Sequence, residues 1–358
     1  MQDAAALATL KAQLLRSWDE GGGGDDQDLP AGVARFQALN ERGPRPGLAI
    51  GHSRRSPEHP PRVELRVAGT SRSRLARARR IKAQAQAEGL DTMLKVIARP
   101  IIALFGSQQV QPFFGGRRQP LHLGCAVANE KGSTGTLGAF VRLDDGREGL
   151  LSCAHVLARR RRGPARVGDP IQHPGPPEAP VPAHRVGSLS DRFAPLVPAR
   201  DNGLKNIDAA VAILAPGAAH AGNRLPAHDA LPAGLRGRVL PAPLDSEELL
   251  EGTPVVKLGR MTGLTRGLVT AIAIENLHVG FGSSTDTSFC FSGVHEVAWE
   301  PDAPPYAVPG DSGSIVLREE SLQPIGIHFC SMTNDNGEST SYIVPWTAIG
   351  ETLGVTML

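Results

Sequence analysis

Short apolar runs separated by turn residues fill the chain from about residue 121 onward. They lie at residues 121–128, 135–143, 149–154, 207–214, 254–258, 267–274, 314–317, 324–329 and 341–344. Runs of this length, bounded by Gly and Pro, are typical of β-strands, and many of them in succession predict a β-barrel or sandwich domain. We expect long connections at 158–206 and 215–252, where the sequence is rich in Pro, and a short closing helix at 345–353.

The first third of the chain has a different pattern. Residues 4–18 place several leucines near one face of a helix, and the glycines that follow predict a flexible break. Two short ranges, 47–50 and 63–67, predict strands, and in the second apolar and charged residues alternate as in a half-buried strand. Residues 71–89 have helical composition and end at a glycine suited to a helix C-terminus, and 92–98 predicts a returning strand.

These patterns divide the chain into three parts. We predict a terminal helix with a glycine-rich linker at 1–27, a small α/β module at 28–118 and a mainly β domain at 119–358. Two interpretations of the terminal helix stay open: a loosely attached segment, or a helix that docks a partner. The α/β module is a candidate regulatory or partner-binding unit.

The composition narrows the class of protein. Hydrophobic residues make up 41% and charged residues 21% of the 358 positions, as in a globular chain, and the net charge of +2 gives no reason to expect a nucleic-acid-binding protein. The four cysteines are too sparse for a disulfide-stapled secreted domain. No signal peptide is evident, and no apolar run reaches the ~18 residues that a membrane span needs. We therefore expect a cytoplasmic protein with reduced thiols, away from membranes.

Basic side chains cluster in the helix predicted at 71–89. They are Arg72, Arg74, Arg77, Arg79, Arg80 and Lys82. The cluster has the charge to bind nucleic acid or an acidic partner. No aromatic residues lie between its members for stacking on bases, so the sequence favours a solvated helix face.

The segment VPGDSGSIV at 308–316 carries the first candidate for chemistry. It places Ser312 in a turn of small residues directly before an apolar strand. Serine becomes a nucleophile when a base takes its proton and donors stabilise the oxyanion that forms. Gly310 lets the backbone turn so that its N–H and that of Ser312 point at one spot, and Asp311 is placed to pair inward and hold the turn. A histidine and a carboxylate are then required elsewhere.

His155 and Asp208 are the candidates for these two roles. An apolar strand runs straight into His155, which holds the imidazole at the end of a rigid element. Asp208 opens an apolar run, where a carboxylate is costly without a partner. A histidine N–H satisfies the carboxylate and fixes the tautomer that leaves the other ring nitrogen for serine. The chain order His155, Asp208, Ser312 is that of chymotrypsin, not that of subtilisin or the α/β-hydrolases.

Over about residues 121–350 the chain resembles the trypsin-like (chymotrypsin-fold) serine peptidases. The local matches are LSCAHVL at 151–157, IDAAVAIL at 207–214, GDSGSIV at 310–316 and KLGRMTGLT at 257–265. The last of these is similar to a bacterial branch of the family, and related domains occur in plant trypsin-like proteins that regulate leaf growth. The resemblance implies a mainly β, two-barrel domain with the triad between two six-stranded antiparallel barrels. It also implies His155 as base, Asp208 as its orienter, Ser312 as nucleophile and the N–H groups of Gly310 and Ser312 as oxyanion hole, with no metal and no cofactor.

Three residues are candidates for binding the substrate side chain before the scissile bond (P1) in the S1 pocket. Family members that cleave after Lys or Arg carry an acid six residues before the serine, whereas Tyr306 stands there in this chain. Many members of the family have a glycine directly after the position of Gly313, whereas this chain has Ser314. The same serine also occurs in glutamyl endopeptidases, whose next strand is similar to IGIHFC at 325–330. By this resemblance His328 hydrogen-bonds a P1 Glu or Gln, although Ala307 stands where those enzymes usually offer a hydroxyl. A histidine packed toward the barrel is the alternative.

Two functions from different classes stay open. The first is a serine endopeptidase that hydrolyses protein or peptide substrates through an acyl-enzyme and is regulated by residues 1–118. The second is a catalytically silent peptidase fold that serves as a scaffold for a partner protein. Occupancy of all three triad positions favours the first. The natural substrate, the trigger and the oligomeric state are left open by the sequence.

Overall fold

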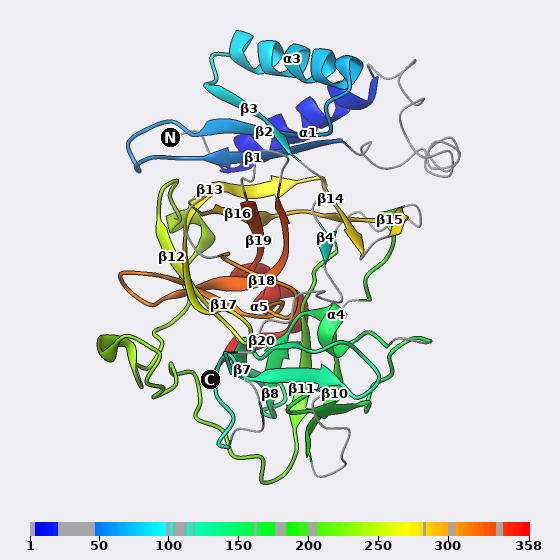
Figure 1. Cartoon of the computed structure of the whole chain (residues 1–358). Helices are drawn as coiled ribbons and strands as arrows, with labels where there is room; N and C mark the ends of the chain where they lie inside the picture. Colours follow the sequence, from blue (N-terminus) through cyan, green and yellow to red (C-terminus); the bar gives the residue numbers. More distant parts are fainter. Residues whose placement is uncertain are drawn as a thin grey trace.

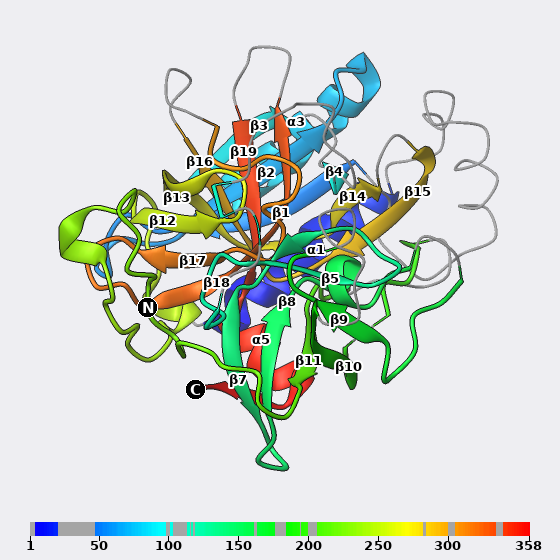
Figure 2. The same ribbon diagram turned by 60° about the horizontal axis from the view of Figure 1, so that its bottom comes forward.

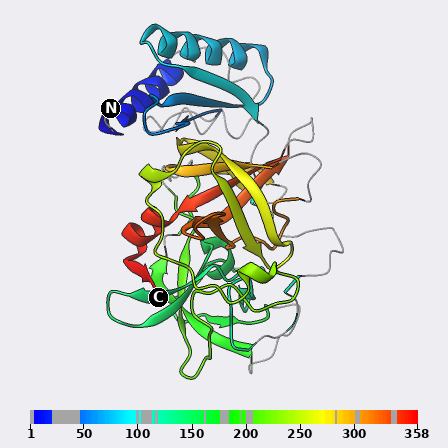
Figure 3. The ribbon, with the colours of Figure 1, turned by 90° about the vertical axis from the view of Figure 1, so that its left-hand side faces the viewer.

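The computed structural model describes residues 4–20, 47–97, 101–102, 113–114, 116, 119–160, 163–175, 184–193, 195–199, 206–281, 284–299, 305–333 and 339–358. In these residues the chain is mainly β and has three stacked parts (Figure 1). An α/β module formed by the N-terminal residues lies at one end, a barrel from the C-terminal half lies in the middle, and another barrel lies at the other end. The view in Figure 3 shows the same order.

The N-terminal module has a three-stranded sheet covered by two helices. Its elements are α1 (Ala4–Glu20), β1 (Leu48–Ser53), β2 (Arg62–Ala68), α3 (Arg72–Ala87) and β3 (Thr92–Ile97). β1 and β2 are antiparallel, whereas β2 and β3 are parallel and are joined by α3 as a crossover. The predicted strand–helix–strand unit is confirmed. The predicted glycine-rich linker and the boundary at 27/28 lie outside the described residues, and the three-part division stays a prediction.

The module uses part of the predicted basic cluster in its own packing. Arg77 is 5% exposed, and its guanidinium lies 4.9 Å from the centre of the Trp18 ring. Arg74 donates to the carbonyl of Ala68 at 2.8 Å. The exposed members of the cluster are Arg72, Arg79 and Arg80. The helix therefore presents fewer free cations than the sequence pattern indicates.

The middle part is a closed barrel of six antiparallel strands, here called the second barrel. Its strands are β12 (Pro254–Gly259), β13 (Gly263–Glu275), β16 (Val294–Ala298), β17 (Ile315–Arg318), β18 (Pro324–Thr333) and β19 (Ser339–Pro345). Pairing runs β12–β13–β16–β19–β18–β17 and returns from β17 to β12. The predicted closing helix follows as α5 (Trp346–Leu353) and packs on β18 and β19.

The end part, here called the first barrel, contains the strands around His155. They are β5 (Ala126–Asn129), β6 (Gly135–Thr136), β7 (Ala139–Leu143), β8 (Glu148–Ser152), β9 (Pro170–Gln172), β10 (Arg185–Phe193), β11 (Ala210–Leu214) and β20 (Val355–Met357). Pairing runs β7–β8–β11–β10–β9–β5, and β6, two residues before β7, pairs back with β5. β20 adds to β7. The predicted mainly β, two-barrel fold is confirmed.

One of the two predicted long connections contains regular structure. β9 and β10 lie inside 158–206, so the prediction of a connection there is wrong for those residues. β10 carries Arg, Ser and Asp between a few apolar residues such as Val186 and Leu189, and the sequence therefore shows no apolar run. The other connection, 215–252, contains the short 3₁₀ helices η4 (Ala233–Leu235) and η5 (Ser246–Glu248).

The module is joined to the second barrel by a shared sheet. β1 pairs antiparallel with β13, so the strands of the module extend the barrel sheet. Arg66 of β2, 2% exposed, contacts Glu296 of β16 at 2.8 Å and Glu64 at 2.9 Å. Lys11 of α1 donates to the carbonyl of Ala273 at 2.6 Å. Strand pairing and buried polar contacts together fix the module on the barrel face remote from the first barrel (Figure 1).

A short strand beyond the module also enters the barrel sheet. β4 (Ile101–Ile102) lies between β18 and the hairpin of β14 (Leu277–Phe281) and β15 (Ser284–Phe291). Figure 2 shows β4 beside β14. Among the helices that the structure describes, none is long and apolar enough to cross a membrane.

Candidate active site

Strand β8 carries the candidate base into the interior. The strand ends at Ser152, Cys153 is extended, and the one-turn helix α4 (Ala154–Leu157) starts directly after it. His155 lies in this turn and is 3% exposed. Its neighbours on both sides belong to the main hydrophobic core, so the backbone that carries the imidazole is held firmly, as a general base requires.

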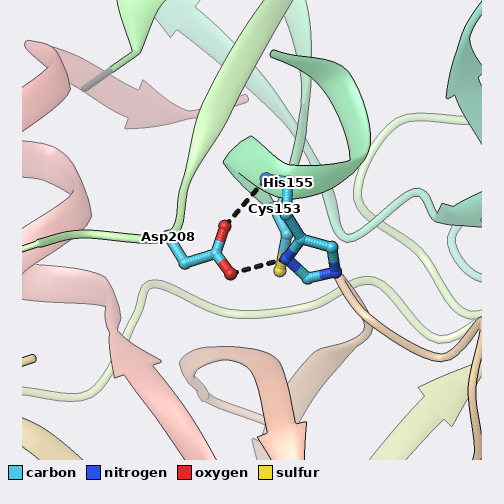
Figure 4. Close-up of side chains that lie close together, drawn as sticks. All are labelled: Cys153, His155 and Asp208. Carbon is cyan, nitrogen blue, oxygen red and sulfur yellow. Dashed lines mark hydrogen bonds and ion pairs between the residues drawn. The ribbon is translucent and has the colours of Figure 1, made fainter. Parts of the chain in front are cut away.

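Asp208 binds His155 with both of its carboxylate oxygens. Its Oδ2 lies 2.6 Å from Nδ1 of the imidazole, and its Oδ1 accepts the backbone N–H of His155 at 2.9 Å (Figure 4). Asp208 is fully buried just before β11, which pairs with β8. The carboxylate therefore fixes the ring orientation and favours the tautomer with the proton on Nδ1. The predicted pairing of the acid with the histidine is present in the structure.

Cys153 completes a group of possible metal ligands but does not fit a metal centre. The donor atoms of Cys153, His155 and Asp208 lie within 4.8 Å of one another. Burial and the nearby Asp208 raise the pKa of the Cys153 thiol well above its ordinary value, which disfavours the thiolate that a metal needs. The thiol donates to the carbonyl of His328 at 3.4 Å, and Asp208 is already used by His155. All four cysteines of the chain are buried, and none of them is in a disulfide bond.

Ser312 lies in a tight turn between Val308 and Ser314. Gly310 and Gly313 have positive φ values of 105° and 95°, which residues with a Cβ rarely adopt. Ser312 is 7% exposed, and in the part of the chain that the structure describes its hydroxyl has no hydrogen-bond partner. The contact between a nucleophile and its base often forms fully only when a substrate is bound.

The Ser312 turn is fastened to both barrels. Thr136 of β6 donates its N–H to the carbonyl of Ser312 at 2.8 Å and its hydroxyl to the carbonyl of Gly310 at 2.9 Å. On the other side, Gly313 donates its N–H to the carbonyl of His328 in β18 at 2.8 Å. The serine is thus held at the boundary between the two barrels.

The same turn lies against the end of the strand that carries the base. A Cβ on Gly313 would collide with the side chain of Ser152 and the carbonyl of Thr136. Ser152 is three residues before His155, and the intervening Cys153 contacts the His328 carbonyl that also accepts the Gly313 N–H. The structure therefore places the Ser312 turn against the strand end that leads into His155, although the two segments are far apart in the sequence.

Alternate backbone N–H groups of the turn are unused. The N–H groups of Asp311 and Gly313 donate within the protein. Those of Gly310 and Ser312 find no acceptor among the described residues. These are the two predicted oxyanion-hole donors, and an oxyanion requires donors that are held in place but not already occupied.

A buried carboxylate supports this turn from behind. Asp311 is fully buried and accepts the backbone N–H groups of Met261 (2.9 Å), Thr262 (3.3 Å) and Val308 (3.1 Å). The hydroxyl of Thr262 donates to it at 2.8 Å, and the ammonium of Lys257 lies 3.3 Å away. Asp311 thereby ties the Ser312 turn to the β12–β13 turn. The sequence predicted that Asp311 pairs inward, but not its partners.

The ionisation of this cluster follows from its contacts. Burial alone would raise the pKa of Asp311, but the Lys257 ammonium and the Thr262 hydroxyl hold it below its ordinary value. Burial lowers the pKa of Lys257, and Asp311 opposes this shift. The Lys257 ammonium also lies 5.5 Å from the centre of the Tyr306 ring. The donors around Asp311 therefore keep it as a carboxylate at neutral pH.

Residues between the N-terminal module and the first barrel also contact the β12–β13 turn. Phe114 is fully buried and donates its N–H to the carbonyl of Arg260 at 3.0 Å. The ring of Phe113 lies where a Cβ on Gly263 would be. The β12–β13 turn is thus covered by residues that precede the predicted domain start at 119.

The S1 candidates differ in their surroundings. His328 of β18 is 3% exposed, and its Nδ1 lies 2.7 Å from the Ser341 hydroxyl. Burial and the nearby Lys257 ammonium lower its pKa to about 3, so its imidazole is neutral at neutral pH. Tyr306 and Ala307 lie in a hydrophobic cluster of the second barrel, where Tyr306 stacks on Trp299. His328 lies beside the Ser312 turn, since its carbonyl accepts the Gly313 N–H, and the assignment of all three residues to substrate binding stays a prediction.

Sequence reasoning missed the residues that hold the turn. Lys257, Thr262 and Thr136 lie in segments that the sequence marks as strand ends or turns. A lysine in an otherwise apolar strand was a usable signal, because a buried ammonium needs a carboxylate partner. Nothing in the sequence identifies Asp311 as that partner.

Comparisons with known proteins give matches to solved structures. No family model and no curated protein sequence matches the chain. A protease from Nocardiopsis is 15% identical with a TM-score of 0.44, and a chymotrypsin from Cellulomonas bogoriensis is 20% identical with a TM-score of 0.43. Each alignment covers 66% of this chain and 99% of the other.

A glutamic acid-specific serine protease, described as using a histidine triad in substrate binding, is also similar. It is 16% identical with a TM-score of 0.45, and the alignment covers 66% of this chain and all of the other. These neighbours are serine proteases of low identity.

Proposed function

We propose that the protein is a serine endopeptidase that uses His155, Asp208 and Ser312. The observation that carries the proposal is the arrangement around His155. Asp208 holds both the ring and the backbone of His155, and the Ser312 turn lies against the end of the same strand with two unused N–H groups. A base, its orienting acid, a nucleophile and oxyanion donors are the parts that acyl transfer requires.

The proposed reaction has two halves. His155 takes the proton of the Ser312 hydroxyl as the oxygen attacks the substrate carbonyl, and the Gly310 and Ser312 N–H groups stabilise the oxyanion. The imidazolium then gives the proton to the leaving amine, and an acyl-enzyme remains. Water, deprotonated by His155, attacks the ester and releases Ser312. The Asp208 carboxylate stabilises the imidazolium in both halves. None of these steps requires a metal or an organic cofactor.

For the P1 residue we propose Glu or Gln, recognised by His328. The imidazole lies beside the catalytic turn and is neutral because its pKa is lowered to about 3. When the Ser341 hydroxyl donates to Nδ1, the other ring nitrogen carries a proton and donates to a side-chain carbonyl or carboxylate. Tyr306 and Ala307 are the further S1 candidates. Arg160, near the site in sequence, forms an ion pair with Asp169 at 2.5 Å, so it adds little to the attraction of acidic substrates.

Labelling with an alkyl fluorophosphonate tests the proposed activity. The wild-type protein is expected to be labelled covalently, and Ser312→Ala is expected to lose the label without losing thermal stability. Labelling that persists in Ser312→Ala would place the reactive group elsewhere. A protein that is never labelled would leave the alternative function, a silent fold that binds a partner protein. P1 profiling with a peptide library then tests the side-chain preference, and a profile led by Lys, Arg or small apolar residues would overturn the assignment of His328.

A further inference from the structure

The inner edge of β18 is the candidate docking edge for an extended peptide. β17 pairs with β18 from Pro324 to Ile327, and two further hydrogen bonds carry the contact to His328. Beyond His328, β18 continues past the Ser312 turn to Thr333, and its other edge is already paired with β19. A peptide whose scissile carbonyl lies at Ser312 can therefore extend along this inner edge by strand addition.

This edge is already occupied by the chain itself. Ile101 of β4 pairs antiparallel with Ser331. Because Ser331 also pairs with Ser341 of β19, β4 must lie on the opposite, inner edge. The second edge of β4 is used as well, since Ile101 and Ile102 pair with Gly280 and Phe281 of β14. In the structure an additional strand has no place beside β18 at this position.

The direction of β4 matches that of a bound substrate. β18 runs away from the Ser312 turn after His328, and β4 is antiparallel to it, so Ile101 to Ile102 runs toward the turn. The residues of a substrate that precede the scissile bond also run toward the nucleophile. β4 therefore lies as the upstream part of a peptide substrate would lie.

We propose that β4 is a built-in occupant of the substrate edge, and that the peptidase is self-inhibited toward extended peptides until β4 leaves β18. This inference rests on the proposed function and adds its regulation. β4 is two residues long, and one of its pairings is parallel, the slightly weaker kind. Such a strand separates at small cost compared with the long strands of the barrel. In the described residues β4 pairs with Ser331 and not with His328, so a substrate that ends at P1 does not need the part of the edge that β4 covers.

A pair of phosphonate probes separates this inhibition from the chemistry. Both are diphenyl phosphonates with the P1 residue preferred in the library profile: one is a single residue, and the other is the tetrapeptide acetyl-Ala-Ala-Ala-P1. Ile101→Pro removes the backbone donor and cannot continue a ladder. The matched control, Ile101→Ala, keeps the backbone donor. Inactivation rates of the wild type and both variants are compared, with thermal unfolding as the check on folding.

The expected result is a change for the long probe alone. Ile101→Pro reacts with the tetrapeptide about tenfold faster than the wild type, as two recovered strand hydrogen bonds predict, whereas the single-residue probe changes less than about twofold. Ile101→Ala behaves like the wild type. The contrary result is that the rate with the tetrapeptide probe, divided by the rate with the single-residue probe, is no higher in Ile101→Pro than in the wild type. If fluorophosphonate labelling is intact, this result overturns inhibition by β4 but not the proposed peptidase activity. Absence of fluorophosphonate labelling in every variant removes the peptidase, and the self-inhibition with it.

A second measurement uses the wild-type chain and covers the case in which Ile101→Pro does not fold. Hydrogen exchange of the amides at 101 and 102 is followed before and after reaction with the tetrapeptide probe. Displacement of β4 predicts faster exchange after reaction. Unchanged protection in the fully inactivated protein contradicts the proposal, because β4 would then have stayed in place beside a bound peptide.

Discussion

The protein buries two clusters of charged side chains. One lies where the module joins the second barrel, and the other lies behind the Ser312 turn. At the junction of the module and the second barrel, Arg66 lies between Glu64 and Glu296, and all three are at most 2% exposed. Behind the Ser312 turn, Lys257 pairs with Asp311, and both are fully buried. The first cluster joins strands from two parts of the chain. The second holds a single turn of backbone.

The difference lies in how much other structure shares each task. The junction is also held by the β1–β13 ladder, so its ions contribute to stability more than to geometry. The Ser312 turn has no such ladder: besides its hydrogen bonds to Thr136 and to the His328 carbonyl, it is held by one carboxylate, Asp311, which gathers three backbone N–H groups and a hydroxyl. Loss of a junction ion should therefore lower the free energy of unfolding, whereas loss of Asp311 should lower the rate of acylation.

The largest effect on stability is expected for Arg66→Met. The change leaves Glu64 and Glu296 buried without their cation, which costs about 3–5 kcal/mol of unfolding free energy. The labelling rate of the protein that remains folded should be unchanged. Urea unfolding together with fluorophosphonate kinetics measures both quantities. A large loss of labelling rate at full folding would remove the distinction between the clusters.

Asp311→Asn should act mainly on the reaction. The amide keeps the shape of the side chain but presents a donor to Val308, Thr262 or Lys257, so the turn loses part of its support. We expect acylation to fall about 10²- to 10³-fold, the range seen when an oxyanion-hole donor is removed. Phosphonate inactivation rates measure this. Retention of more than half the wild-type rate would show that the turn is held by other contacts.

Acid should weaken the junction before it unfolds the barrels. His52 lies in β1 of the module, and His295 lies in β16 of the second barrel. Burial and the nearby Lys11 lower the pKa of His52 to about 3 and that of His295 to about 4. Both bind a proton more readily in the unfolded chain, so their stabilising effect is complete above about pH 6.5 and is lost as the pH falls toward 4. Each contributes a slope of up to about 1.4 kcal/mol per pH unit in that window. His295→Gln should lower the slope of stability against pH, and an unchanged slope would contradict this.

The smallest effect is expected for Lys257→Met. Asp311 keeps its three backbone donors and the Thr262 hydroxyl, so the turn should survive with a loss of acylation of about tenfold or less. Its labelling rate at several pH values is the measurement. Because the lysine no longer favours the carboxylate, activity in Lys257→Met should be lost at a higher pH than in the wild type as the solution is acidified. Identical acid limits would mean that Lys257 only fills space.

The candidate triad was accessible from the sequence because each member sits where chemistry is unusual for its surroundings. Asp208 opens an apolar strand, and His155 ends one. Strands such as β12, β13 and β18 were predicted because each contains an apolar run bounded by turn residues. β10 was not predicted because Arg, Ser and Asp lie between its few apolar residues, so it contains no apolar run. Pairings between distant segments, such as β1 with β13 and β4 with β18, leave no local pattern and required the structure.

The pairing of β1 with β13 also has a consequence for the order in which the protein is made. Ribosomes release a chain from its N-terminus, so β1 emerges long before the strand that covers its free edge. The edge of β1 that pairs with β13 therefore stays unpaired until residues up to Glu275 have been synthesised. Lys257 likewise precedes Asp311, and both histidine and acid precede the serine. A nascent chain therefore carries an unpaired strand edge, but it lacks the proposed nucleophile until the second barrel is nearly complete.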